Sequence, residues 1–215
     1  GCASSGSCDV NYCMIAYRNC VFSQNTFEAG VYALEATQHI YENCLIAANG
    51  PFEQIWALQN SSMTFVNCVI IGQKNNPNPA LRLENGSVTF NQCTFVDVPF
   101  LADIPGRSMG KLKIMNSIIA GTEKPFLKMA PEVKADRVTM SNNVYHQTPG
   151  VDFGGKTYNS ENWADFCRET KMDAESQWAD PGLNGILKSQ TPKDLEILKK
   201  GRYYGQPIRI GAELP

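Results

Sequence analysis

The sequence predicts an all-β solenoid in the form of a three-stranded parallel β-helix of about six coils. First, an amide residue followed by a small residue recurs along the chain at spacings of 24, 24, 25, 24 and 26 residues. Second, apolar residues alternate with other residues on both sides of this motif, which is the period of a β-strand. Third, a further short apolar stretch precedes the motif in the second to fourth repeats, and no helical segment separates the strands. A fixed period of this kind without helices is typical of stacked β-coils.

The amide residue of each repeat is expected at a sharp corner between two strands. Asparagine tolerates the left-handed backbone conformation that such a corner requires. Strands of neighbouring coils lie about 4.8 Å apart, so each side-chain amide can donate to the next side-chain carbonyl. The sequence therefore predicts an asparagine ladder along the solenoid. Its members are Asn19, Asn43, Asn67, Gln92, Asn116 and Asn142.

The residue after each corner forms a second column, which holds half of the eight cysteines. A free cysteine behaves as a small apolar residue, so this column is expected to point inward. Sulfurs stacked on neighbouring coils lack the geometry of a disulfide, which predicts free thiols. The column contains Cys20, Cys44, Cys68 and Cys93, followed by Ser117 and Asn143. Whether Cys2, Cys8 and Cys13 form a bridge among themselves stays open.

Apolar residues four and two positions before each amide define the inward columns of the strand that leads into the corner. The first column is Ile15, His39, Met63, Val88, Leu112 and Val138, and the second is Tyr17, Tyr41, Phe65, Phe90, Ile114 and Met140. In this position His39 is expected to be a core histidine rather than a ligand. In the third strand the larger apolar residues are expected to face inward, namely Tyr32 and Leu34, Trp56 and Leu58, and Leu81 and Leu83. A leucine-rich repeat has a similar period, but its leucines stand at other offsets from the asparagine.

With these columns, residues 10–146 resemble the right-handed parallel β-helix proteins of the pectate-lyase-like superfamily. Residues 179–183 (ADPGL) and 207–212 (PIRIGA) are similar to the closing segment of many secreted bacterial β-helix proteins, although Gln206 stands where that pattern has serine. The resemblance implies a right-handed coil, a secreted, periplasmic or cell-surface location, and carbohydrate or a cell-surface glycan as partner. It specifies a fold and not a reaction.

The chain is expected to divide into a β-helix, residues 1–146, and a C-terminal cap, residues 147–215, packed on the end and outer face of the helix. The spacing of Trp163, Phe166 and Cys167 predicts a short amphipathic helix in this cap, and a second one is expected after Thr191. An apolar stripe is expected on the outer face of the strand after the corner, and an exposed stripe of this kind is normally covered by another segment or chain. It consists of Val21, Leu45, Val69, Thr94, Ile118 and Val144. We expect the C-terminal segment with Trp163 and Trp178 to cover it; a homo-oligomer or a missing N-terminal domain is the alternative.

Composition excludes some partners. The 19 basic and 21 acidic residues give a formal net charge of −2, which argues against a nucleic-acid binder. No run of 18 apolar residues occurs, so no membrane span is predicted. Motifs for phosphate or dinucleotide binding and for a serine nucleophile are absent from the sequence.

The lyases among the resembled proteins use an outward acidic cluster that holds calcium, with a nearby arginine or lysine as base. On the matching strand, Glu35, Gln59 and Glu84 are expected in one outward column, and Arg82 and Lys128 in the other. Glu35 and Glu84 would lie about 10 Å apart, at the wide edge of the separation in inverting glycoside hydrolases. Because no further acidic residues support calcium, we predict neither a cofactor nor a metal site.

Two longer loops, residues 72–79 and 96–109, are expected to wall a groove beside this face. They contribute Lys74, Asp97, Asp103 and Arg107 as candidate ligand contacts, together with Gln59. The expected function is a non-catalytic extracellular module with an extended surface for carbohydrate. The first alternative is a polysaccharide lyase or glycoside hydrolase with its groove on the Glu35, Arg82, Glu84 and Lys128 face. The second is a structural or assembly module that uses the apolar stripe.

Overall fold

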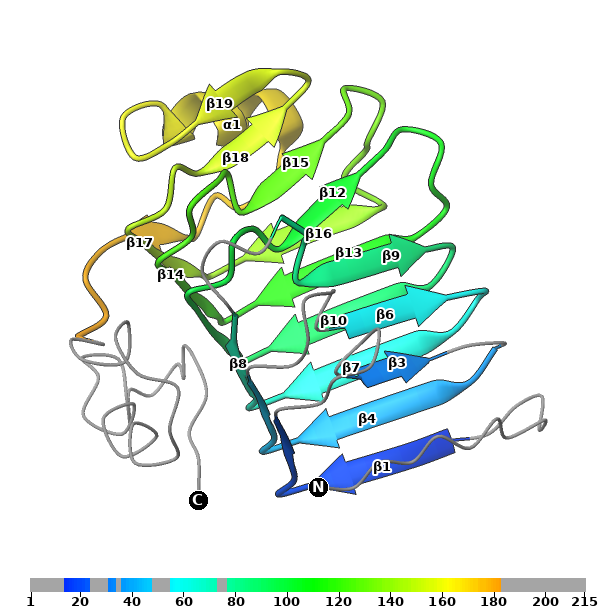
Figure 1. Cartoon of the computed structure of the whole chain (residues 1–215). Helices are drawn as coiled ribbons and strands as arrows, with labels where there is room; N and C mark the ends of the chain where they lie inside the picture. Colours follow the sequence, from blue (N-terminus) through cyan, green and yellow to red (C-terminus); the bar gives the residue numbers. More distant parts are fainter. Residues whose placement is uncertain (1–13, 24–30, 34–35, 48–54, 73–76, 183–215) are drawn as a thin grey trace.

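The chain folds into one stack of parallel β-coils with a short helix near its C-terminal end (Figure 1). The computed structural model describes residues 14–23, 31–33, 36–47, 55–72 and 77–182. Within them, every strand pair of the solenoid is parallel, and one antiparallel hairpin occurs near the C-terminal end. The predicted all-β parallel solenoid is therefore confirmed.

The strand before each corner belongs to a six-stranded sheet, here sheet A. Its strands in spatial order are β1 (Met14–Arg18), β4 (Gln38–Glu42), β7 (Ser62–Val66), β10 (Ser87–Asn91), β13 (Lys111–Met115) and β16 (Val138–Ser141). The strands pair without a shift, so the two predicted inward columns are in register along the whole sheet. Chain order and spatial order agree, as expected for a solenoid in which each coil contacts only its neighbours.

The strand after each corner belongs to sheet B. Its strands in spatial order are β2 (Val21–Ser23), β5 (Leu45–Ala47), β8 (Val69–Ile71), β11 (Thr94–Val96), β14 (Ile118–Ala120), β17 (Val144–His146) and β20 (Gln177–Trp178). All three residues of the four central strands β5, β8, β11 and β14 are buried, including those on the outer face. The apolar outer stripe is therefore covered from β5 onward, whereas Val21 in the first coil is 54% exposed.

The third face consists of two short sheets that continue each other. Sheet C contains β3 (Val31–Ala33), β6 (Ile55–Leu58) and β9 (Leu81–Glu84). Sheet D contains β12 (Ala102–Ile104), β15 (Leu127–Met129), β18 (Val151–Phe153) and the antiparallel β19 (Lys156–Tyr158). Leu81 N donates to Leu101 O at 2.7 Å, which places β9 beside β12 in the same parallel arrangement (Figure 1).

A column of stacked aromatic rings fills the interior beneath sheet A. The ring centroids of Tyr17 and Tyr41 lie 4.9 Å apart, those of Tyr41 and Phe65 4.7 Å, and those of Phe65 and Phe90 5.0 Å. Each pair is stacked, because in-register parallel strands superpose identical positions. His39 is buried in the neighbouring column, where its Nδ1 lies 3.3 Å from the Tyr41 hydroxyl, and burial lowers its pKa. This environment agrees with the expectation of a core histidine.

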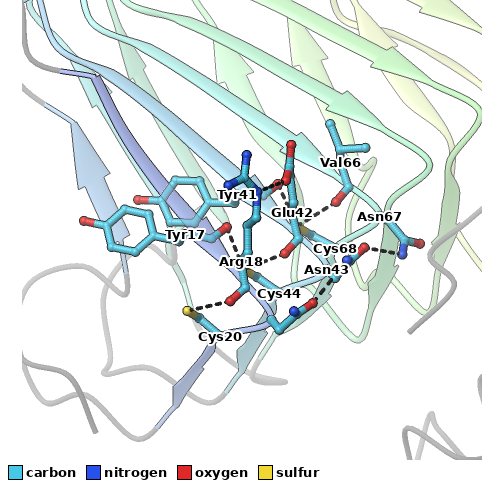
Figure 2. A network of polar contacts seen from close by, with 11 residues as sticks. Tyr17, Arg18, Cys20, Tyr41, Glu42, Asn43, Cys44, Val66, Asn67 and Cys68 are labelled. Carbon is cyan, nitrogen blue, oxygen red and sulfur yellow. Dashed lines mark hydrogen bonds and ion pairs between the residues drawn. The ribbon is translucent and has the colours of Figure 1, made fainter. Parts of the chain in front are cut away.

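The corners carry an asparagine ladder (Figure 2). Asn43 donates its side-chain amide to Asn19 at 3.1 Å, and Asn67 donates to Asn43 at 2.7 Å. All six corner residues have a left-handed backbone, with φ between 51° and 57°. In the last coils the amide of Asn142 donates to Asn116 at 2.8 Å.

One position of the ladder differs from the prediction. Asn116 donates its amide to the side chain of Asn91 at 2.8 Å, and not to Gln92. Gln92 holds the corner backbone with a φ of 57°. Its side chain is one methylene longer than that of asparagine, and the shorter amide of its neighbour takes the place in the ladder. The assignment of Gln92 to the ladder is therefore wrong for its side chain and right for its backbone.

The cysteine column faces inward, and its members are free thiols. Cys44, Cys68 and Cys93 are buried, and each thiol lies 3.3 to 3.6 Å from one backbone carbonyl oxygen of its own coil and one of the preceding coil. Figure 2 shows these contacts for Cys44 and Cys68. From the fifth coil the column becomes polar: Ser117 accepts the Cys93 amide at 3.1 Å, and Asn143 accepts the Ser117 amide at 3.0 Å.

In the second and third coils the third strand has the opposite phase from the one predicted. Val31, Ala33, Ile55 and Ala57 are buried in the core, whereas Trp56 and Leu58 are only half-buried on the outer side. Only Leu81 and Leu83 face inward as expected. Gly86 lets the third and fourth coils approach each other here, because a Cβ at this position would lie 2.8 Å from the Ala57 carbonyl oxygen.

The last coil is covered by a helix and a two-residue strand. Helix α1 (Trp163–Thr170) is the predicted amphipathic helix, and Trp163 and Phe166 are its buried residues. Trp163 and Trp178 both contact Tyr145, with ring centroids 5.2 and 5.3 Å from it. Tyr145 is an interior residue, so both tryptophans close the end of the solenoid. The expectation that they lie over the apolar outer stripe is wrong. The helix predicted after Thr191 lies outside the described residues.

Candidate functional site

A column on the outer side of sheets C and D contains one side chain from each coil. Trp56 pairs with Arg82, and Asp103 pairs with Lys128, which pairs with Asp152. The bond from Leu81 to Leu101 joins the two groups by placing Arg82 beside Asp103. We call Trp56, Arg82, Asp103, Lys128 and Asp152 the outward column. Beyond the tryptophan its charges alternate in sign, which favours neighbouring strands at this short spacing.

Trp56, Arg82 and Glu84 form a cluster at one end of the outward column. The Arg82 guanidinium carbon lies 4.9 Å from the centre of the Trp56 ring, a cation–π geometry. Its Nε and Nη2 atoms also contact Glu84 Oε1, at 2.7 and 2.6 Å. The side chains of Arg82 and Glu84 are about half exposed, so the ion pair itself contributes at most about 1 kcal/mol to stability. Its effect is to hold a cation and a carboxylate beside an aromatic ring at the surface.

The other end of the outward column holds a looser ion pair. Lys128 Nζ lies 3.6 Å from Asp103 Oδ2, and both side chains are at least half exposed. Asp152 instead accepts a hydrogen bond from the Gly155 amide at 2.9 Å, which fixes the turn between β18 and β19. The exposed lysine and aspartate are free to exchange their mutual contact for contacts with a polar ligand, because a surface pair of this length is weak.

The candidate catalytic residues Glu84 and Lys128 are held in two separate ion pairs. Glu84 is bound by Arg82, and Lys128 is bound by Asp103. Among the described residues no group of three histidine, cysteine, aspartate or glutamate side chains could hold a metal ion. An aromatic ring beside charged groups can recognise a ligand with both apolar and polar faces.

The predicted site residues are only partly brought together. Arg82, Asp103 and Lys128 share the outward column, and Glu84 adjoins it. Gln59 is exposed but lies at a corner with a φ of 51°, and Arg107 is exposed in the turn after β12. Glu35 and Lys74 lie outside the described residues. Asp97 is 8% exposed, so it does not offer its carboxylate to a surface ligand.

The predicted column of Glu35, Gln59 and Glu84 is wrong by one residue. Glu84 pairs with Leu58 and not with Gln59. The third coil has two left-handed residues at this corner, Gln59 and Asn60, whereas the fourth has only Asn85. The extra residue shifts Gln59 out of the strand, because register in a sheet changes by whole residues. The sequence analysis did not identify Trp56 and Asp152 as site residues. Extending the repeat to the next strand would have placed Asp152 in the column, whereas Trp56 can be placed there only once the phase of its strand is known.

Comparison with known proteins agrees with this fold. Residues 2–102, slightly less than half of the chain, match the family model described as right handed beta helix region. The parallel coils continue beyond this match in the same register, through β16 and β17. No curated protein and no solved structure matches the chain. Among the described residues, no helix has the length and apolar character needed to cross a membrane.

Proposed function

We propose that this right-handed parallel β-helix is a non-catalytic module that binds carbohydrate along its outward column. The observation that carries the proposal is the half-buried Trp56 ring, with Arg82 and Glu84 held beside it. A sugar ring has apolar C–H faces and polar hydroxyl edges. The indole supports the first, and charged groups accept or donate hydrogen bonds to the second.

The geometry of the column supports an extended rather than a compact ligand. The five positions follow one another at one strand spacing each, so the column is roughly 19 Å long. Cations and carboxylates alternate along it, and two exposed ion pairs lie on it, Arg82 with the adjoining Glu84 and Lys128 with Asp103. An extended glycan can exchange these pairs for its own hydroxyl groups one after another, without a pocket that encloses it. The resemblance to secreted β-helix proteins supports an extracellular location for such binding.

The proposal is tested with a glycan-array screen, followed by titration calorimetry on the glycans that bind and by product analysis of the same mixtures. We expect saturable binding without products, and a loss of at least tenfold in affinity in Trp56→Ala. Thr64→Ala on the outer side of sheet A is the matched control and should bind as the wild type. Absence of binding to any glycan, or equal binding by Trp56→Ala, would refute the proposal.

The same mixtures distinguish the enzymatic alternative. Release of unsaturated or shortened sugars that disappears in Glu84→Gln would show a lyase or hydrolase on this face. Such a result would replace the binding proposal, because a carboxylate that only positions Arg82 is not needed for bond cleavage.

A further inference from the structure

Asp173 closes the interior of the solenoid at its C-terminal end. It is 3% exposed and lies three residues after the end of α1, where its backbone amide donates to the Met140 carbonyl at 3.1 Å. Its carboxylate accepts hydrogen bonds from the Asn143 amide at 3.3 Å, from the Tyr145 hydroxyl at 2.7 Å and from the Ser176 hydroxyl. Asn143 and Tyr145 belong to the last full coil, and Ser176 belongs to the segment that covers it. The carboxyl group therefore links the closing segment to the last full coil through hydrogen bonds.

The carboxyl group lacks a compensating positive charge. Its hydrogen-bond donors are neutral. Within the described part of the chain, Asp173 forms no ion pair with a lysine, arginine or histidine. Burial disfavours the charged form of a carboxyl group, while hydrogen bonds from hydroxyl and amide groups favour it. Here burial is the larger effect and raises the pKa of Asp173 to about 6, with the bonds from Ser176, Tyr145 and Asn143 acting in the opposite direction.

Few other groups near Asp173 titrate. Tyr145 of β17 and Cys167 of α1 face it, and burial raises the pKa of each, so both stay neutral below pH 7. His146, the next residue of β17, is directed to Asp180 instead, 3.8 Å away. The α1 charges Asp165 and Arg168 pair with each other at the surface. Of the three groups that face one another here, Asp173 is the one whose pKa lies between 4 and 7.

We propose that Asp173 is a pH-sensitive latch: when protonated it holds α1 and β20 closed on the last coil, and when ionised it loosens them. The protonated carboxyl keeps acceptor capacity for its donors and adds a donor of its own, without a buried charge. When the segment opens, the carboxylate is hydrated, and the edge of β17 loses its pairing with β20. Acid closes this end of the solenoid and neutral pH relaxes it.

The direction follows from proton linkage. The pKa of Asp173 is about 6 in the closed state, above the ordinary value of 3.8 expected when it is hydrated. The closed state therefore binds the proton more tightly, and its advantage is complete below about pH 4 and lost as the pH rises through 6. A difference of about two pKa units corresponds to a change of roughly 100-fold in the opening equilibrium.

Tryptophan placement gives a local readout. The chain has three tryptophans, and Trp163 and Trp178 both lie in the closing segment, so the variant Trp56→Phe reports on that segment alone. We expect its fluorescence, and the hydrogen exchange of residues 163–178, to show an opening transition with a midpoint near pH 6. Exchange in β7 and β10 should stay unchanged over the same range.

Variants in the Trp56→Phe background assign the transition. Asp173→Asn should remove it and His146→Gln should keep it, while Asp165→Asn is the matched surface control and should behave as the parent. Tyr145→Phe removes one donor to the carboxylate and should move the midpoint to higher pH, which keeps the test decisive if Asp173→Asn does not fold. A transition that persists in Asp173→Asn, disappears in His146→Gln or keeps its midpoint in Tyr145→Phe overturns the latch.

Discussion

Asn67 donates its side-chain amide to the side-chain oxygen of Asn43 at 2.7 Å, one coil away, and Asn43 donates in turn to Asn19 at 3.1 Å. Asn43 is thus both acceptor and donor in the ladder, at a residue with a φ of 54°. Two properties of asparagine are used at once, namely its amide and its tolerance of the left-handed backbone.

Replacing Asn43 separates these two properties. Asn43→Ala loses both ladder bonds and places a Cβ residue in the left-handed region, so we expect it to lower the free energy of unfolding by about 2 to 4 kcal/mol. Asn43→Gly also loses the bonds, but glycine adopts the left-handed backbone without strain. It should therefore lower the free energy of unfolding by about half as much. Urea denaturation measures both values. Equal costs for the two variants would show that the backbone conformation contributes nothing.

Asn91 and Gln92 should respond differently to substitution. Because Asn91 accepts the Asn116 amide, Asn91→Ala is expected to lower the free energy of unfolding by about 1 kcal/mol. Gln92→Asn keeps an amide and a residue that tolerates the left-handed backbone, and should change stability by less than about 0.5 kcal/mol. Thermal unfolding of both variants checks this order, and the reverse order would place Gln92 in the ladder.

The aromatic stack should be sensitive to a gap in its centre. Phe65 is fully buried between Tyr41 and Phe90, and Phe65→Ala is expected to lower the free energy of unfolding by about 3 to 5 kcal/mol. Phe65→Leu retains most of the volume and should cost clearly less. Chemical denaturation followed by circular dichroism measures the difference. If the two variants were equally stable, the ring stack would not be a packed column.

The interior thiols should be protected from alkylation. Hydrogen bonding between neighbouring thiols and burial raise the pKa of Cys44, and the pKa of Cys68 is also raised, so thiolate is scarce in both at pH 8. Iodoacetamide followed by peptide mass analysis should therefore leave Cys44, Cys68 and Cys93 unmodified in the native protein. In urea all three should react. Rapid native labelling of Cys68 would contradict an inward column.

The corner motif carried most of the fold information because each coil repeats it at nearly constant spacing. A position such as Cys68 is defined by five equivalent positions, so an error in one coil does not change the column. The third strand lacked this support. Trp56 looks like a core residue by size, yet Ile55 and Ala57 are buried instead, in register with Leu81 and Leu83 of the next coil.

The candidate site was predictable only where its strands follow the period. Arg82 and Lys128 were placed in one column by counting, and the backbone register agrees. Predicting which residue pairs with Glu84 required knowing that the preceding coil has one additional corner residue. No pattern of hydrophobicity reveals that residue. Asp173 gave no signal at all, since an isolated aspartate in a polar stretch looks like a surface residue until its burial is known.

The column that carries sulfur from Cys20 to Cys93 and ends with Ser117, Asn143 and Ser176 gives the solenoid a direction. If a coil from the N-terminal part were placed next to Ser176, it would put a cysteine thiol where the Asn143 side chain now bonds to Ser117 and Asp173. The coils are therefore alike in backbone but not interchangeable, and duplication or deletion should be tolerated among the first four coils and fail at the last two.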